Sequence, residues 1–447
     1  MKKIIDAVEK NKDLILNAER YIWENPETGF FEYKTNAYMI DAFEKLGYKV
    51  NKPDDITGFY TTIDTGKVGP TILLFAELDA LICASHPESD KETGAAHVCG
   101  HNAQCATILG VAAALTDKEI LDELCGKIKI CLVPAEEGIE IGKRKELLKQ
   151  GVITFASGKP EFIKRGYFSD VDIAFMVHAK SSDDGKKFYL GKGSNGVLRK
   201  STTFKGVAAH AGSAPDKGIN ALNVAATAIN VINSLRETFR EEDHVRVHSI
   251  ITKGGDVVNA VPDKVVMESY VRASSVKALK ETNQKVNRAI TAVAAAFGAN
   301  VKIEDMPGSE AMKDDDNFNK LAKETLIELC GEEQIGQEGW LASSTDMGDA
   351  STLWPTIHAY ACGTVGTLHS KDFFVKDVQN LCFECAEFQL MLIKKLLENG
   401  AKRAQYIIDN YHPVFANVEE YVEHKLTMKM EKETVLYNTD GTINLNF

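Results

Sequence analysis

Hydrophobic and polar positions follow two kinds of pattern in the first two hundred residues. Apolar residues recur at helical spacing in three stretches: 4–22, 39–46 and 103–115. Compact apolar runs of strand length lie between and after them: 71–75, 128–133 and 173–177. Strands that alternate with helices favour crossover connections. The pattern therefore predicts an α/β domain whose mostly parallel sheet is covered by helices on both faces.

A different pattern begins near Val197 and ends near Gly308. Strand-like, helical, strand-like, strand-like and helical stretches follow one another: 200–205, 218–235, 245–252, 264–272 and 276–297. This order predicts a small α+β domain, residues 197–308, inserted into a discontinuous catalytic domain made of 1–196 and 309–447. The run Gly191–Gly196 matches GxGxxG, but a strand-like segment follows it where a dinucleotide fold needs a helix, so we interpret it as a hinge.

Composition restricts the partners and the compartment. The 447 residues exceed a single core, which agrees with two domains. With 64 acidic against 52 basic residues and no basic patch with interleaved aromatics, neither nucleic acid nor a membrane is an expected partner. No apolar stretch approaches the ~20 residues of a membrane span, and the N-terminus lacks a signal core. Nine scattered cysteines indicate free thiols, so we expect a cytoplasmic protein.

Ionisable residues stand where the three apolar runs end. The first run is followed by Glu77 and Asp79, the second by Glu136 and Glu137, and the third by His178. Sites in open α/β sheets gather at the carboxyl ends of the strands, so these groups are expected at one rim. Singly, each has a structural interpretation, and a lone histidine such as His178 is more often structural than a ligand. Their convergence favours a functional site.

Cys99 and His101 add a thiolate and an imidazole to these carboxylates. This mixture of ligands suits zinc-class divalent ions. Two residues apart on a helix, the pair would point to nearly opposite faces, so both must lie in a turn before a helix that begins near Asn102, and Gly100 permits that turn. A thiol at a helix N-terminus near a cation is expected to have a lowered pKa, which favours the thiolate that metal binding needs. Glu136 and Glu137 are adjacent, so their side chains should diverge: one would bind metal and the other would face a metal-activated water. The spacing alone does not show which glutamate has which role.

A series of motifs in one order resembles the M20 family of metallopeptidases, in particular its amidohydrolase branch of aminoacylases, hippurate hydrolases, auxin-conjugate hydrolases and aminobenzoyl-glutamate hydrolases. The motifs cover most of the chain: Asn25-Pro26-Glu27, Glu32, Ala76–Leu81, His97–Asn102, Pro134–Glu137, Val177-His178, Ala209–Ala211, Gly254–Pro262, Ser344–Gly348 and Thr367–Ser370. The resemblance implies a catalytic domain with an inserted lid and dimerisation domain, and therefore a homodimer.

The resemblance also implies a role for each matching position. Two divalent ions per subunit, Zn²⁺ or Mn²⁺, would be held by five ligands: Cys99 shared between the ions, His101, Glu137, His178 and His369. Glu136 would be the general base and Asp79 the carboxylate that orients a ligand. His210 would reach a neighbouring subunit's site to polarise the scissile carbonyl, and Asn259 and Arg272 would hold the substrate carboxylate.

Several positions depart from the pattern of the branch. Asn102 and Gln104 stand where many members have Asp and His, and Glu77 replaces the more common Asp. The segment 82–96 is expected to remodel the rim of the site, and the tail 415–447 has no assigned role. The Cys382–Cys385 pair has CxxC spacing within a helical stretch, which we interpret as buried structural thiols. The remaining histidines are expected at the surface or in structural roles: His86, His244, His248, His358, His412 and His424.

The sequence thus predicts a metal-dependent amidohydrolase that cleaves an N-acyl or N-aroyl amino acid, or a similar small amide conjugate, with a Glu general base. A dipeptidase or carboxypeptidase of the same family is the alternative among hydrolases. A non-catalytic metal-binding or peptide-binding protein on the same scaffold is a rival of another class, and a dinucleotide-dependent oxidoreductase is a weaker one.

Overall fold

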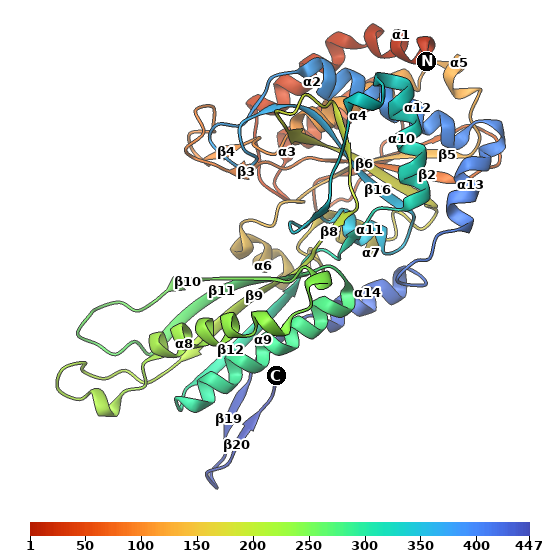
Figure 1. Ribbon diagram of the computed structural model, residues 1–447. Helices are drawn as coiled ribbons and strands as arrows, with labels where there is room; N and C mark the ends of the chain where they lie inside the picture. Colours follow the sequence, from red (N-terminus) through yellow and green to blue (C-terminus); the bar gives the residue numbers. More distant parts are fainter. The chain divides into compact units, whose positions relative to one another are not determined.

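The computed structural model describes residues 1–447, which form two compact units (Figure 1). Unit 1 consists of Met1–Gly193, Lys313–Trp340 and Asp349–Val418, and unit 2 of Ser194–Met312, Leu341–Gly348 and Glu419–Phe447. Unit 2 extends a few residues beyond the predicted insertion at both ends, to 194 and 312, and also contains two separate segments that were predicted in the catalytic domain, 341–348 and 419–447. No helix is both long and apolar enough to cross a membrane.

Unit 1 is built on an eight-stranded sheet in the order β1-β5-β2-β6-β16-β7-β14, with β17 paired to β16. The neighbours β5, β2, β6 and β16 run parallel, whereas β1, β7 and β17 pair antiparallel to their neighbours β5 and β16. The strands are Phe59–Asp64 (β1), Thr71–Glu77 (β2), Lys127–Val133 (β5), Ile173–Ser181 (β6), Phe188–Leu190 (β7), Ile335–Gln337 (β14), Thr356–Val365 (β16) and Phe374–Val375 (β17). The predicted largely parallel sheet is confirmed.

Helices cover both faces of this sheet because β2 presents apolar side chains to each. On one face, Ile72 and Leu74 pack in the main core with residues of helices such as α4 (His101–Ala114) and α12 (Cys385–Leu397). On the opposite face, the ring of Phe75 contacts the ring of Phe168 edge to face, and Phe168 follows helix α7 (Gly158–Lys164) in the chain. The other main helices are Lys2–Lys10 (α1), Lys12–Glu24 (α2), Tyr33–Lys45 (α3), Ile141–Lys149 (α6), Asp316–Cys330 (α10) and Lys402–Asp409 (α13). Figure 1 shows α1, α2 and α12 gathered around α4.

Unit 2 is a five-stranded antiparallel sheet in the order β10-β11-β9-β12-β18. Its strands are Gly196–Lys205 (β9), Arg246–Lys253 (β10), Lys264–Ala273 (β11), Asn300–Pro307 (β12) and Met430–Glu433 (β18), and its long helices are Ala221–Ser234 (α8) and Val276–Ala296 (α9). Side chains of β11 alternate between buried and half-exposed, and the buried ones pack under α8 and α9. The unassigned tail therefore supplies an edge strand, β18, and a hairpin of Val435–Tyr437 (β19) and Ile443–Leu445 (β20).

Candidate dinuclear metal site

The turn before α4 presents Cys99 and His101 from one short segment. Gly100 has φ 88°, and a Cβ at this position would lie 2.4 Å from the Cβ of Ala179, so a glycine is needed both for the turn and for the close approach to β6. Helix α4 begins at His101, one residue earlier than predicted, and is buried along its whole length. Both side chains are therefore carried by a segment that packing holds in place.

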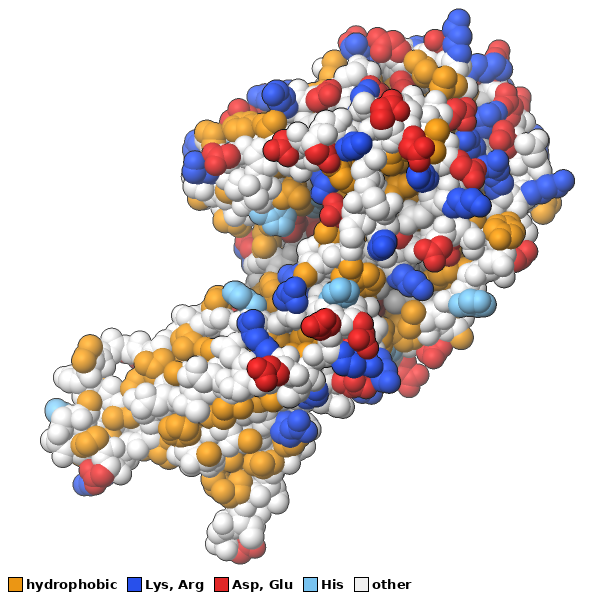
Figure 2. All heavy atoms as spheres, viewed as in Figure 1, with side chains coloured by type: hydrophobic (Ala, Val, Ile, Leu, Met, Phe, Trp, Pro, Cys, Tyr) orange, Lys and Arg blue, Asp and Glu red, His pale blue; other side chains and the backbone are white.

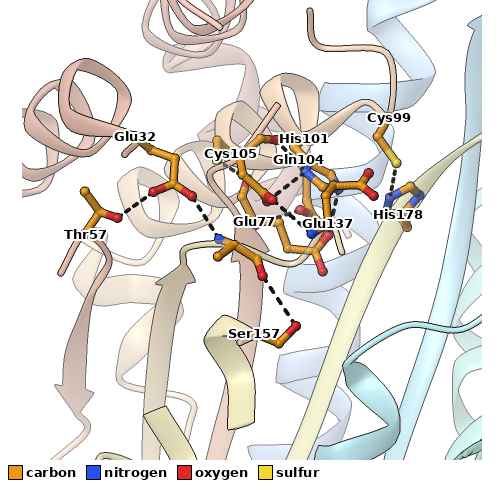
Figure 3. A network of polar contacts seen from close by, with 12 residues as sticks. Glu32, Thr57, Glu77, Cys99, His101, Gln104, Cys105, Glu137, Ser157 and His178 are labelled. Atoms are coloured by element: carbon orange, nitrogen blue, oxygen red, sulfur yellow. Dashed lines mark hydrogen bonds and ion pairs between the residues drawn. The ribbon is translucent and has the colours of Figure 1, made fainter. Parts of the chain in front are cut away.

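Backbone carbonyls orient two histidines in the way that metal binding through Nε2 needs. The Nδ1 of His101 hydrogen-bonds the carbonyl oxygen of Asp79 at 2.8 Å, and the Nδ1 of His178 hydrogen-bonds the carbonyl of Ala179 at 2.8 Å. Because a carbonyl only accepts, each Nδ1 carries a proton, which leaves Nε2 as the ring atom that can face a metal ion. The Nε2 of His178 lies 3.4 Å from the Sγ of Cys99, as Figure 3 shows.

His369 approaches Cys99 from another side. It lies in the loop between β16 and β17, with φ 64°, and its backbone N–H donates to the carbonyl of Val98 at 2.9 Å. Its Nε2 is 3.2 Å from the Sγ of Cys99 and 3.3 Å from Oε1 of Glu137. The donor atoms thus form two groups that share Cys99: one with His101 and His178, the other with Glu137 and His369.

Several of the buried donor atoms have no hydrogen-bond partner in the protein, and divalent cations would supply one. In each group the donors lie within 4.8 Å of one another. The Nε2 of His101 and Oε2 of Glu77 lie 3.1 Å apart, yet neither atom has a partner with hydrogen-bond geometry, and the same holds for Oε1 of Glu137. Buried polar atoms are normally satisfied, and a set of thiol, imidazole and carboxylate donors is suited to zinc-class ions.

The two adjacent glutamates are carried by a strained turn after β5. Ala135 has φ 57°, and the buried Arg144 of α6 donates hydrogen bonds to the carbonyls of Ala135, Glu137 and Ala156. The backbone N–H of Glu137 donates to Oδ2 of Asp79 at 2.9 Å. The carboxylate of Glu136 groups with His101 and Glu77 instead of with Cys99. The turn therefore sends the two side chains to different partners.

Burial sets the ionisation of the shared thiol. Burial first, and then the charge of Glu137, raise the pKa of Cys99 well above its ordinary value. The lowered pKa expected for this thiol concerns a helix N-terminus near a cation, so it stays a prediction for the metal-bound protein. Burial also opposes ionisation of Glu137, but the close imidazole of His369, 3.3 Å away, holds the pKa of that carboxyl below its usual range.

The departures from the family pattern have structural partners in this chain. The amide of Asn102 donates to Oε1 of Glu19 at 2.8 Å. Gln104 accepts from the backbone N–H of Glu77 at 2.8 Å and donates to the carbonyl of Val177 at 3.2 Å, so it joins β2 to β6. Glu77 itself is buried against the ammonium of Lys159 on α7, 2.5 Å away.

Three predicted site residues lie in unit 2. His210 and Asn259 are neighbours, because His210 forms a β-bridge with Ala260 and the N–H of Ala211 donates to the carbonyl of Asn259 at 2.9 Å. Both side chains are exposed. Arg272 on β11 instead donates to the hydroxyl of Ser344 at 3.0 Å. Their roles toward substrate stay predictions.

Sequence reasoning missed the buried cations around the site. Arg144 and Lys159 stand in polar stretches with nothing in the pattern to mark them as buried. Of the histidines expected outside the site, His86 and His358 are buried. All nine cysteines are free, and burial raises the pKa of both Cys382 and Cys385.

Comparisons with known proteins agree with this geometry. Residues 193–298 match the family model of the peptidase dimerisation domain of M20 enzymes. The hippurate hydrolase of Campylobacter jejuni is 27% identical over 317 residues, covering 70% of this chain and 78% of its own. The Xaa-Arg dipeptidase of Mus musculus is 27% identical over 395 residues, covering 83% and 82%. A dinuclear metal binding peptidase of the M20 family from Bacillus subtilis has a TM-score of 0.67 at 21% identity, covering 87% and 99%.

The class of protein that the chain resembles is therefore that of the M20 hydrolases, since its relatives are named as a hippurate hydrolase and an Xaa-Arg dipeptidase. The chain has the M20 peptidase fold with a dimerisation domain, and the resemblance predicted from its motifs is confirmed.

Proposed function

We propose that this protein is a metal-dependent amidohydrolase that cleaves an N-acyl or N-aroyl amino acid, or a similar small amide conjugate. One observation carries the proposal: two groups of metal-type donors share the Sγ of Cys99, and a further carboxylate, that of Glu136, stands beside them. A purely structural metal site would use its donors to close the coordination sphere, with no carboxylate beside it to handle a proton.

The chain's own residues would hold two divalent ions, Zn²⁺ or Mn²⁺. His101 and His178 would bind one ion, Glu137 and His369 the other, and Cys99 both. Such ions, when bound, activate water and polarise a carbonyl oxygen. Asp79 supports this arrangement by accepting from the N–H of Glu137 with its carboxylate and from Nδ1 of His101 with its backbone carbonyl.

Proton transfer falls to Glu136. Its carboxylate would accept the proton of the attacking water and then donate it to the leaving amine, which a single carboxylate can do when it lies within reach of both atoms. We keep His210 as the group that polarises the scissile carbonyl, and Asn259 and Arg272 as partners of the substrate carboxylate. All three are cationic or hydrogen-bonding groups, as those tasks require.

We also propose a homodimer formed through unit 2. The sheet edge at β12 is covered by β18, whereas β10 is an open edge with mostly exposed side chains. Exposed apolar residues gather on it and just beyond it: Ile250, Ile251, Val257 and Val258. Figure 2 shows hydrophobic side chains along this unit, with few charged ones toward its far end. An open apolar edge invites pairing with another strand, here that of a second copy.

The substrate class is tested with a panel of N-acyl amino acids, N-aroyl amino acids and dipeptides after addition of Mn²⁺ or Zn²⁺. The names of the relatives support both groups of substrate, because one is a hippurate hydrolase and another an Xaa-Arg dipeptidase. Preferred turnover of acyl or aroyl conjugates supports the proposal, and preferred turnover of dipeptides supports the dipeptidase alternative. No turnover of any member by metal-loaded protein would favour the non-catalytic rival. The cytoplasmic location stays a prediction from the free cysteines.

A further inference from the structure

Residues 82–96, here called the strap, fold into an ordered hairpin beside the metal site. Strand β3 (Leu81–Ile82) pairs antiparallel with β4 (Ala95–Ala96) at its base. Near its tip, Oδ1 of Asp90 accepts hydrogen bonds from the backbone N–H groups of Glu92 and Thr93. The strap begins three residues after Asp79 and ends three residues before Cys99. Both of its ends are therefore tied to the site.

His86 is the buried centre of the strap, with 2% of its surface exposed. Its Nδ1 accepts a hydrogen bond from the backbone N–H of Glu88 at 3.1 Å, so the proton is on Nε2. That Nε2 lies 3.0 Å from the carbonyl oxygen of Phe373, to which it donates. The ring also packs against Trp23 and Phe374, with centroid distances of 5.7 and 4.9 Å.

A second contact fastens the strap to α2. The indole N–H of Trp23 donates to Oε2 of Glu88 at 2.6 Å. Since Glu88 also supplies the N–H that fixes the tautomer of His86, the two contacts act on adjacent parts of one turn. These two contacts hold the His86 ring in the orientation in which its Nε2 donates to the carbonyl of Phe373.

The partner of His86 ends the loop that carries a metal ligand. Residues 366–373 connect β16 with β17 and include His369, whose side chain is 52% exposed. Core packing therefore does not hold this ligand, and its positive φ is unfavourable for a residue with a Cβ. Apart from the contacts of the His369 side chain, the loop is held by the bond from the His369 N–H to the carbonyl of Val98, by the buried ring of Phe373 at its end, and by the bond from His86 to the carbonyl of Phe373.

We propose that His86 is a positioning residue for the metal group formed by Cys99, Glu137 and His369, through its hydrogen bond to the His369 loop. The other group depends on it less, because His101 and His178 are carried by α4 and β6 and not by this loop. The inference rests on the dinuclear site of the proposed function. It assigns the strap a specific task, namely to set the affinity of one of two ions.

Three substitutions separate the hydrogen bond from packing. His86→Phe keeps an aromatic ring against Trp23 and removes the donor. His86→Gln loses the ring but keeps an N–H donor at nearly the same reach. His86→Asn, whose shorter amide reaches the N–H of Glu88 and not the carbonyl of Phe373, is a second donor-deleted variant should His86→Phe fail to fold. Glu92→Ala, at the exposed tip of the strap, is the matched control.

Calorimetric titration of chelator-treated protein with Zn²⁺ is the first measurement. Wild type and Glu92→Ala are expected to bind two ions. His86→Phe and His86→Asn should bind one ion with wild-type affinity and the other at least about tenfold more weakly, the scale of changes to groups that support metal ligands. His86→Gln should restore the weaker site to within a few-fold. Three results would overturn the proposal. Both affinities in His86→Phe and His86→Asn could equal those of wild type, or both could be weakened by the same factor. The third such result is a His86→Gln variant that binds the second ion no better than His86→Phe does.

Hydrogen exchange of the metal-free protein is the second measurement, and it does not depend on metal. The amides of 366–373 should exchange faster in His86→Phe and His86→Asn than in wild type, while those of α4 should not change. Unchanged exchange in the loop would contradict the role of His86. If wild type itself bound a single ion, the dinuclear function would fail, whereas the loop exchange would still decide whether His86 positions His369.

Discussion

Arg144 offers the most direct test of how the catalytic turn is held. Its guanidinium is buried, lies over the ring of Phe30 with 5.7 Å to the centroid, and donates to the carbonyls of Glu137 and Ala156 at short range. A third contact, to the carbonyl of Ala135, is longer at 3.4 Å. Arg144→Met keeps much of the side-chain volume and removes every donor, so the carbonyls of the turn lose their charged partner.

The expected cost follows from the two short bonds. A hydrogen bond that involves a charged group contributes about 1.5–3 kcal/mol, so their loss amounts to about 3–6 kcal/mol before the turn relaxes. Arg144→Lys keeps the charge but has a single point donor that cannot span both carbonyls, so it should recover less than half of this. Relaxation of the turn by as little as ~1 Å would also lower turnover by about 10²-fold.

Chemical denaturation followed by tryptophan fluorescence measures the free energy of unfolding of unit 1, the unit that contains Arg144. The three tryptophans of the chain all lie in this unit: Trp23, Trp340 and Trp354. Lys149→Met on the exposed end of α6 is the control and should stay within about 0.5 kcal/mol of wild type. A free energy of unfolding for Arg144→Met within about 1 kcal/mol of wild type would refute the reasoning.

Three further predictions concern single side chains. Glu136→Gln should lower kcat by about 10²–10⁴-fold at unchanged metal content, and near-normal turnover would exclude Glu136 as the base. Cys99→Ala should lower metal content by elemental analysis, since both ions lose a ligand, while Cys125→Ala should not; equal content in both would remove Cys99 as the shared ligand. Burial first, and then Glu384 and Glu9, raise the pKa of Glu387 to about 7. Because this folded-state pKa exceeds the unfolded value, the stabilising contribution is complete below about pH 4.5 and is lost as the pH rises through about 7. Glu387→Gln should therefore flatten the fall in unit 1 stability between about pH 4.5 and 7, and an unchanged slope would contradict the assignment.

The main features of the site could be predicted from the sequence because continuous apolar runs show where the central strands end. The runs that became β2, β5 and β6 are continuous and apolar, and parallel pairing places their carboxyl ends at one edge. From the sequence alone, the same rule predicts that five residues share one region: Glu77, Asp79, Glu136, Glu137 and His178.

Other features depend on tertiary contacts that no local pattern encodes. The apolar spacing of 4–22 continues through Asn11, yet the chain forms two helices there, α1 and α2. The tail joins unit 2 because β18 finds the edge of β12, more than a hundred residues earlier in the chain. His86 was expected at the surface or in a structural role, and only its contact with Phe373, 287 residues away, gives it a specific partner.

The central claim, that two metal ions share the sulfur of Cys99, is tested most directly by X-ray absorption of the zinc-loaded protein. The account predicts two ions per chain, on average one sulfur ligand at each, and scattering from a second metal at about 3.5–4 Å. A single ion, or two ions without a sulfur ligand, would contradict it.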